Sequence, residues 1–326
     1  MVGLPSPITG SPHKEPEKPR APRLRGFFFF CLGLSKAGTL RVHALLLRVP
    51  ASIFLPMRFR LATWNINSVR LRVDLVGRFA RAHRPDLICL QEIKCIEGKF
   101  PELELRALGF PHIAVAGQKG YHGVAILSRL PFTLDERRDI CGRGHARHLS
   151  VTLDGANPIV LHNIYVPAGG DVPDPALNEK FRHKLDFLEA MDAWFRAMRG
   201  KAKRRMIVVG DLNVAPLPTD VWSHKQLLKV VSHTPAEVER FERVQASRNW
   251  VDVMRRHVPA EEKLFTWWSY RNRDWRASNR GRRLDHIWTT PALDGAAISM
   301  TVLDEARDWP RTSDHVPVIA DFAIDE

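Results

Sequence analysis

Apolar and polar residues alternate in a regular way from Met57 to the end of the chain. Short apolar runs rich in Val, Ile and Leu are typical of β-strands, and several of these runs end directly in polar residues. We predict nine strands, at 60–66, 86–92, 112–117, 123–128, 147–153, 158–166, 206–213, 283–290 and 315–322.

Two longer segments carry apolar residues at intervals of three or four positions, which is the spacing of one face of a helix. The first is predicted at 68–83, ahead of Pro85, with a buried face of Leu71, Leu75, Phe79 and Ala82. The second is predicted at 178–198, with a buried face of Phe181, Leu185, Leu188, Phe195 and Met198. Strands that alternate with helices predict a mixed α/β domain built in layers.

Residues 1–56 differ in composition from the rest of the chain. They hold eight Lys/Arg and two Asp/Glu, and their apolar run Phe27–Leu34 is much shorter than the ~20 residues of a membrane span. The charged residues that follow this run fit poorly with the cleavage site of a signal peptide. We therefore predict that 1–56 is a disordered or non-native N-terminal extension and that 57–326 is the folded domain.

The chain of 326 residues has a formal net charge of +13 and a pI of about 10.0. This charge favours a polyanionic partner, nucleic acid or an anionic membrane surface, although basic residues can also serve solubility alone. The four cysteines form no CxxC pair, and Cys89 lies inside an apolar run, where a buried thiol is expected. Sparse, unpatterned cysteines are typical of a reducing cytoplasm.

Acidic and amide side chains, and one histidine, follow several of the apolar runs. They are Asn65, Asn67, Gln91, Glu92, Asp211, Asn213, Asp285, Asp314 and His315. Unpaired charges near a core are costly, so such groups normally pair with one another or hold a metal. If these strand ends converge, carboxylate and amide oxygens with few His and no Cys favour Mg²⁺ or Mn²⁺ over Zn²⁺.

Asp211 and Asn213 are separated by one residue, so on an extended segment they point to the same side. One of them could polarise a water while the other orients it or touches a phosphate. His315 is a natural proton-transfer or phosphate-contacting group. Taken singly, each residue has a structural alternative: an Asp or Asn can cap a helix, and Tyr165 can be a strand-end aromatic.

Several well-known signatures are missing from the sequence. It contains no GxGxxG, P-loop, HExxH or GxSxG motif. Readings as a nucleotide-cofactor enzyme or a serine hydrolase therefore have no motif support.

Seven motifs in a fixed order carry a family resemblance. They are TWNINSVR (63–70), LQEIK (90–94), NIYVPAGG (163–170), GDLNVAP (210–216), FTWWSYR (265–271), NRGRRLDHIW (279–288) and SDHVPV (313–318). This set resembles the exonuclease III family of Mg²⁺-dependent AP endonucleases, within the endonuclease/exonuclease/phosphatase superfamily. The resemblance covers residues 57–324, and segment 222–235 is similar to the exonuclease III-like branch in bacteria.

The resemblance implies a four-layer α/β sandwich, with two packed mixed β-sheets flanked by helices. It implies a catalytic set of Tyr165, Asp211, Asn213, Asp285 and His315. It implies a metal site among Asn65, Glu92, Asp211, Asn213, Asp314 and His315, with Asp314 and His315 as a pair. It implies DNA contacts by Trp267, Trp268, Arg271 and Asn279, although the tandem tryptophans alone would more often be core packing.

Within the resemblance, Asp211 would be the general base and Glu92 a metal ligand, while Tyr165 would contact the scissile phosphate. Asp285 would orient a catalytic group. One position departs from the family pattern: Ala168 stands where an Asn or Gln often touches DNA.

The implied function is a Mg²⁺- or Mn²⁺-dependent DNA repair phosphodiesterase. It would cleave 5′ to abasic sites and act as a 3′–5′ exonuclease on double-stranded DNA, as a cytoplasmic monomer without a membrane partner. One alternative is a sister phosphodiesterase or phosphatase acting on lipid or inositol phosphates. Another is a non-catalytic nucleic-acid-binding relative. The basic charge, and the FTWWSYR string near NRGRRLD, favour DNA.

Overall fold

The computed structural model describes residues 57–155, 157–198, 204–272 and 274–324. The predicted extension, residues 1–56, lies outside the described residues, so the domain boundary at Met57 stays a prediction. Among the described residues, no helix combines the length and the apolar character that crossing a lipid bilayer requires.

One six-stranded sheet has the order β13-β14-β1-β2-β4-β3. Its strands are β1 (Met57–Asn65), β2 (Leu87–Gln91), β3 (His112–Ala116), β4 (Val124–Ser128), β13 (Ala297–Val302) and β14 (Val318–Ile324). β1 is parallel to β2 and antiparallel to β14, so the sheet is mixed.

The second six-stranded sheet has the order β5-β6-β7-β8-β12-β9. Its strands are β5 (Phe132–Glu136), β6 (His148–Leu153), β7 (Ile159–Tyr165), β8 (Arg205–Asp211), β9 (Val251–Asp252) and β12 (Asp285–Thr289). β7 and β8 are parallel, and β12 runs antiparallel to β8. A small ladder joins β10 (Trp267–Trp268) to β11 (Gly281–Arg282).

The two large sheets pack face to face. Leu61 and Cys89 of the first sheet belong to the same buried cluster as Leu161 and Ile207 of the second. Interdigitated apolar side chains of this kind are what hold two aligned sheets together. Asn163 of β7 adds a polar link: its Nδ2 donates to the carbonyl oxygens of residues 90 and 125, at 3.0 and 2.9 Å. Its Oδ1 accepts from Nε2 of residue 91, the last of β2, at 2.7 Å.

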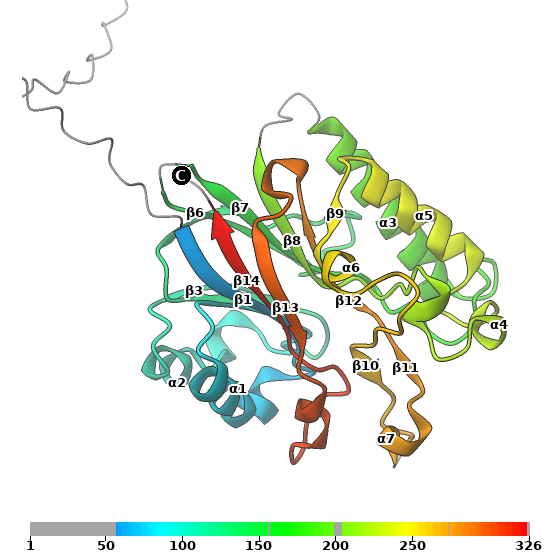
Figure 1. The fold of residues 1–326 in the computed structure, drawn as a ribbon, viewed down its shortest axis with the longest axis horizontal. Helices are drawn as coiled ribbons and strands as arrows, with labels where there is room; N and C mark the ends of the chain where they lie inside the picture. Colours follow the sequence, from blue (N-terminus) through cyan, green and yellow to red (C-terminus); the bar gives the residue numbers. More distant parts are fainter. Residues whose placement is uncertain (1–56, 156, 199–203, 273, 325–326) are drawn as a thin grey trace, which may run out of the picture. The chain divides into compact units, whose positions relative to one another are not determined.

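Helices cover the outer faces of both sheets. α1 (Val69–His83) and α2 (Glu102–Ala107) lie on the first sheet. α3 (Glu179–Ala197) and α5 (Pro235–Ala246) lie on the second, and Figure 1 shows the two groups on opposite outer sides. Three further α-helices are short: α4 (His224–Leu227), α6 (Val253–His257) and α7 (Trp275–Ser278). The predicted four-layer α/β sandwich is confirmed.

α1 buries a different face from the predicted one. Phe79 is buried as expected, but Leu71 is 72% exposed and Ala82 is also exposed. The helix is interrupted at Arg72, whose φ of −132° is not helical, so the apolar pattern changes phase there. The buried face consists of Val69, Val76, Gly77, Phe79 and Ala80.

The second predicted helix is confirmed as α3, whose N-cap Asn178 accepts a hydrogen bond from the backbone N–H of Lys180. α5 was not predicted, although Thr234 and Glu237 form a capping box at its start. The strands β5 and β13 were missed because both are sheet edges with mostly exposed or half-exposed residues.

The fold brings the polar strand ends to one place. β1 and β2 are parallel and end at Asn65 and Gln91, while β7 and β8 are parallel and end at Tyr165 and Asp211. β12 runs in the opposite direction and begins at Asp285, directly opposite Asp211. Both sheets therefore supply side chains to the same edge of the sandwich.

Candidate active site

A cavity of about 570 Å³ lies at this edge. The predicted site residues in its wall are Glu92, Tyr165, Asp211, Asn213, Trp267, Arg271, Asp314 and His315. Two of them follow a strand with left-handed backbone: φ is +55° at Glu92 and +54° at Asn213. Non-glycine residues adopt this conformation rarely, and here it turns the chain sharply out of each strand into the cavity wall.

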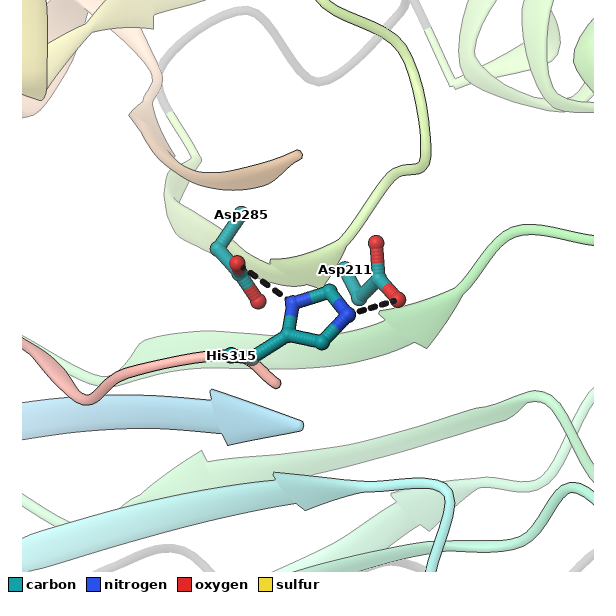
Figure 2. Close-up of side chains that lie close together, drawn as sticks. All are labelled: Asp211, Asp285 and His315. Atoms are coloured by element: carbon teal, nitrogen blue, oxygen red, sulfur yellow. Dashed lines mark hydrogen bonds and ion pairs between the residues drawn. The ribbon is translucent and has the colours of Figure 1, made fainter. Parts of the chain in front are cut away.

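His315 lies between two buried carboxylates, as Figure 2 shows. Its Nδ1 donates to Asp285 Oδ2 at 2.8 Å, and its Nε2 lies 3.6 Å from Asp211 Oδ2. The strand predicted at 315–322 begins only at Val318, because Pro317 has no N–H for a ladder. His315 is thus free of the large sheets and makes a single bridge to Trp267.

Burial and charge set the protonation of this group. Burial raises the pKa of Asp211 to about 7, although the charge of His315 opposes this shift. Burial alone would lower the pKa of His315, but the carboxylates of Asp285 and Asp211 outweigh it and raise the pKa to about 10. At neutral pH the imidazole is therefore protonated, and its Nε2–H points toward Asp211.

Asp211 is held by hydrogen bonds from several directions. Asn65 Nδ2 donates to its Oδ2 at 2.8 Å. The backbone N–H and the Nδ2 of Asn213 donate to its two oxygens, each at 3.0 Å. Asp211 and Asn213 meet as predicted, but through the left-handed turn at Asn213 and not along an extended segment, so the expected backbone geometry was wrong.

Glu92 is bound by an amide and an ammonium group. Its Oε2 accepts from Asn65 Nδ2 at 3.0 Å, and its Oε1 lies 2.8 Å from Lys94 Nζ. The Oδ1 of Asn65 accepts the backbone N–H of Asn67 at 3.0 Å. Asn65 therefore turns its nitrogen, not its oxygen, toward the two carboxylates, and the prediction of Asn65 as a metal ligand does not fit this arrangement.

Asp314 does not pair with His315, so the predicted pair was wrong. Its Oδ2 accepts from Trp267 Nε1 at 2.9 Å, and its Oδ1 accepts from Asn67 Nδ2 at 3.2 Å. Adjacent residues of an extended chain point to opposite sides, and His315 is instead engaged by Asp285 and Asp211.

Tyr165 ends β7 beneath a buried guanidinium. The Cζ of Arg147 lies 4.9 Å from the centre of the Tyr165 ring, and its Nη1 donates to the Tyr165 carbonyl oxygen at 3.1 Å. Burial, followed by the charges of Glu92 and Asp211, raises the pKa of Tyr165 well above its usual value. The phenol stays protonated and can act as a hydrogen-bond donor.

The two tryptophans face different parts of the molecule. Trp267 lines the active-site cavity, whereas Trp268 is 4% exposed and packs beside Trp275, at 4.9 Å between ring centroids. Trp268 Nε1 donates to Asn279 Oδ1 at 3.1 Å, and both line a separate cavity of about 330 Å³. Trp267 and Trp268 point to different sides because successive strand residues alternate faces, and the DNA contacts of Trp268 and Asn279 stay a prediction.

Lys94 and Arg147 were not singled out from the sequence as functional, and Asn67 was noted only as a polar residue after an apolar run. Lys94 Nζ donates to Asn67 Oδ1 at 2.6 Å and so connects Glu92 with Asp314 through Asn67. Both lie inside the quoted motifs, where their positions beside Asn65 and Glu92 were an available signal. Arg147 lies outside every quoted motif, so only its burial in the fold reveals its contact with Tyr165.

The site contains residues that could bind a hard cation, but some of them are better ligands than others. Asp211, Asp285 and His315 are close enough together to hold a metal, and Asp285 Oδ1 has no hydrogen-bond partner among the described residues. A protonated His315 is a poor metal ligand, however, because its nitrogens carry protons. The oxygens of Glu92 and Asp211 beside it form the better match to Mg²⁺ or Mn²⁺.

Comparisons with known proteins agree with this geometry. The chain is 27% identical over 269 residues to exodeoxyribonuclease III of Haemophilus influenzae, covering 80% of this chain and 98% of the relative. It is 28% identical over 271 residues to the DNA repair nuclease APEX1 of Danio rerio, covering 81% and 82%.

Solved structures give the same result. An AP endonuclease from Archaeoglobus fulgidus superposes with a TM-score of 0.74 at 29% identity, covering 81% of this chain and 99% of that one. The 3′–5′ exonuclease NExo from Neisseria meningitidis superposes with a TM-score of 0.73 at 28% identity, with the same coverages. The family model described as "Endonuclease/Exonuclease/phosphatase family" matches residues 62–315. The chain therefore belongs to the endonuclease/exonuclease/phosphatase family of phosphoester hydrolases.

Proposed function

We propose that this protein is a DNA repair phosphodiesterase that cleaves 5′ to abasic sites and acts as a 3′–5′ exonuclease on double-stranded DNA. The observation that carries the proposal is the cavity in which Asp211 and His315 face one another beside Glu92. This arrangement places a carboxylate base, a protonated imidazole and a metal-binding carboxylate within one concave site.

In the proposed reaction, water attacks the scissile phosphorus in line with the leaving 3′ oxygen. The new P–O bond forms as the bond to that oxygen breaks, and the leaving oxygen takes a proton from solvent. Asp211 accepts the proton of that water, since burial has raised its pKa to about 7, near the working pH. The imidazolium of His315 donates from Nε2 to a phosphate oxygen and offsets the negative charge that develops there. Asp285 is bound to the other ring nitrogen and fixes the orientation of the ring.

Two further residues position the phosphate in this proposal. Asn213 is anchored by Asp211 and by the carbonyl of Val166, which Asn213 Nδ2 contacts at 2.9 Å. Its turn therefore sets the distance between the base and the incoming water. Tyr165, protonated at every relevant pH, donates its hydroxyl to a second phosphate oxygen.

We infer that the cofactor is Mg²⁺ or Mn²⁺, held by Glu92 with the help of Asp211, because this oxygen-dominated set suits a hard cation. When bound, the ion would neutralise charge on the phosphate oxygens. Lys94 Nζ lies 2.8 Å from Glu92 Oε1, so Glu92 would share this oxygen between the ammonium group and the ion.

The proposed substrate is duplex DNA with abasic sites or 3′ ends. The names of the relatives point to it: an exodeoxyribonuclease III, a DNA repair nuclease and an AP endonuclease. The net charge of +13, and the arginines around the cavity, suit a polyanion. We further propose that the protein acts as a cytoplasmic monomer, in keeping with the free thiols of Cys89, Cys95 and Cys141.

Two alternatives lead to different experimental results. A sister enzyme for lipid or inositol phosphates would hydrolyse those compounds and leave DNA intact. A non-catalytic DNA-binding relative would bind abasic duplex without cleaving it, with or without metal.

The test is an incision assay on matched duplexes with and without an abasic-site analogue, and on a duplex with a 3′ phosphate. We expect incision with Mg²⁺ or Mn²⁺ and none in excess EDTA. Asp211→Asn should reduce turnover on the order of a thousandfold with binding retained, because an amide cannot accept the proton. Activity of this variant within tenfold of wild type, or unchanged activity in EDTA, would remove Asp211 or the metal from the mechanism.

A further inference from the structure

The guanidinium of Arg282 reaches the active-site cavity without a carboxylate partner. Its Nη1 donates to Val231 O and Ser232 Oγ, each at 2.8 Å. Its Nε is buried and has no hydrogen-bond partner, and no ion pair joins Arg282 to an acidic residue in the part of the chain that the structure describes. Two neutral oxygens therefore hold a cation in the cavity wall.

The next residue, Arg283, is a buried arginine that does have acidic partners. Arg283 directly follows β11, with Nε 2.8 Å from Asp220 and Nη1 2.6 Å from Asp252. Burial lowers the pKa of Arg282, with only the charge of Glu237 opposing it, and Glu237 is itself paired with Lys184. Arg282 itself is half-buried, with a buried Nε. A charge withdrawn from water without a counter-ion is costly, so the missing anion is expected to arrive with the substrate.

Backbone pairing places Arg282 in one row with His315. Trp267 pairs with Arg282 in the small ladder and forms a bridge with His315 on its other side. Directly opposed residues of antiparallel strands point to the same face, and two ladder steps place Arg282 and His315 about 10 Å apart at Cα. All three residues line the cavity.

The side chain of Arg282 leans back over the middle of this row. Its Cζ lies 5.2 Å from the ring centroid of Trp267, the geometry of a cation–π contact. The guanidinium thus lies against the indole of Trp267, the residue that stands between Arg282 and His315 in the row. A planar guanidinium with unused donors is suited to bind the oxygens of a phosphate.

We propose that Arg282 binds the phosphodiester next to the scissile phosphate, in the strand that is cleaved. This subsite rests on the proposed function, since it assumes a polynucleotide whose scissile phosphate lies at His315. The indole of Trp267 lies between the two phosphate sites. The sugar that links the two phosphates would therefore lie against this indole in the cavity. Arg282 then sets where the strand stops within the site, which the catalytic residues alone do not determine.

The test is a double-mutant cycle between the protein and a single phosphate. An abasic duplex carries a neutral methylphosphonate at one of the two phosphates that flank the scissile one. Binding is measured in EDTA for wild type, for Arg282→Leu, and for Arg256→Leu, an exposed arginine outside the cavity that serves as the control. At the contacted position, the methylphosphonate should weaken wild-type binding about tenfold or more. It should have little further effect on Arg282→Leu.

A second readout distinguishes a phosphate contact from a merely structural role. Loss of one contact should reduce the slope of log affinity against log salt by roughly one in Arg282→Leu, as expected for one phosphate. The methylphosphonate and Arg282→Leu could instead weaken binding independently, so that their two fold-losses of affinity multiply at both flanking positions. In that case the proposal is wrong. Should Arg282→Leu melt well below wild type, Arg282→Gln repeats the cycle, because it removes the charge but keeps a polar side chain in the cavity wall.

Failure of this subsite is separable from failure of the proposed function. Wild-type incision of the unmodified abasic duplex with Mg²⁺ tests the function. Efficient incision together with a missing Arg282–phosphate coupling counts against the subsite alone.

Discussion

Lys184 of α3 and Glu237 of α5 form an ion pair in which neither side chain is exposed to solvent. Lys184 Nζ also donates to the carbonyl oxygen of Asn213 at 2.6 Å. Glu237 accepts the backbone N–H groups of Ser232 and Thr234. One buried pair thus connects the turn that follows Asp211 to the loop that holds the guanidinium of Arg282.

Removal of only one member of this pair should be costly. We expect Lys184→Met to lower the free energy of unfolding by about 3–5 kcal/mol, because it leaves a buried carboxylate without its partner. Replacement of both residues, Lys184→Met with Glu237→Leu, should cost clearly less. Denaturant unfolding of both variants measures this, and a double variant as unstable as the single one would contradict the explanation.

Stability should also depend on a buried histidine pair at acidic pH. His148 Nε2 and His162 Nδ1 lie 3.1 Å apart between β6 and β7. Burial, and then nearby positive charge, lowers the pKa of His162 to about 3 and that of His148 well below its usual value.

The sign follows from the unfolded chain, where a histidine has a pKa of about 6.5. Above that pH both states are neutral and stability is at its full value. As the pH falls from about 6.5 toward 3, only the unfolded chain gains protons, so each histidine costs ~1.4 kcal/mol per pH unit. In His162→Gln the free energy of unfolding should change less steeply with pH, by the equivalent of about one proton. Unfolding measurements between about pH 7 and 5 give this slope. Val160→Ala, a core change without a titratable group, should keep the wild-type slope, and equal slopes in all three proteins would contradict the assignment.

The two adjacent tryptophans should behave differently on substitution. Trp267→Ala is expected to impair incision at abasic sites more than removal of a 3′ phosphate, since an aromatic face is worth about 1–3 kcal/mol in nucleic-acid contacts. Trp268→Ala should instead lower stability by about 3–5 kcal/mol, because its indole is buried. Both activities and the melting temperature of each variant check this. A common loss of both activities with a lower Tm in Trp267→Ala would assign Trp267 to the core as well.

A chain that begins at Met57 should fold and retain its specific activity. The reason is that β1 starts at Met57 and that the composition changes there. Thermal melting and turnover of the shortened protein are compared with those of the full chain. A marked loss in either would show that residues 1–56 contribute to the fold or to DNA binding.

The sequence predicted the fold wherever the apolar pattern was strong. The strands that end at Asn65, Gln91, Tyr165 and Asp211 lie in the interior of their sheets, so their apolar runs are long and distinct. The edge strands β5 and β13 carry exposed residues on both sides and give no such signal. The face of α1 was misjudged because a break at Arg72 changes the phase of the pattern.

The sequence predicted which residues form the site better than it predicted which of them hydrogen-bond to one another. Motif order identified Asp285, Asp314 and His315, but their partners depend on which way each side chain points after the last strand residue. Asp285 binds a histidine 30 residues away, whereas Asp314, adjacent to that histidine, faces Trp267. Contacts of this range follow from sheet register, which no local spacing encodes.

The hydrogen bonds of Asn163 between the two sheets have a consequence for how activity can be lost. Asn65 ends β1 and Glu92 directly follows β2 in one sheet, whereas Asp211 and Asp285 belong to the other. A slip of one sheet past the other by a fraction of a residue would separate these groups while every strand stayed intact. The rate of turnover therefore depends on how the two sheets are aligned. Substitutions in the interior, far from the cavity, can abolish activity while the secondary structure is retained.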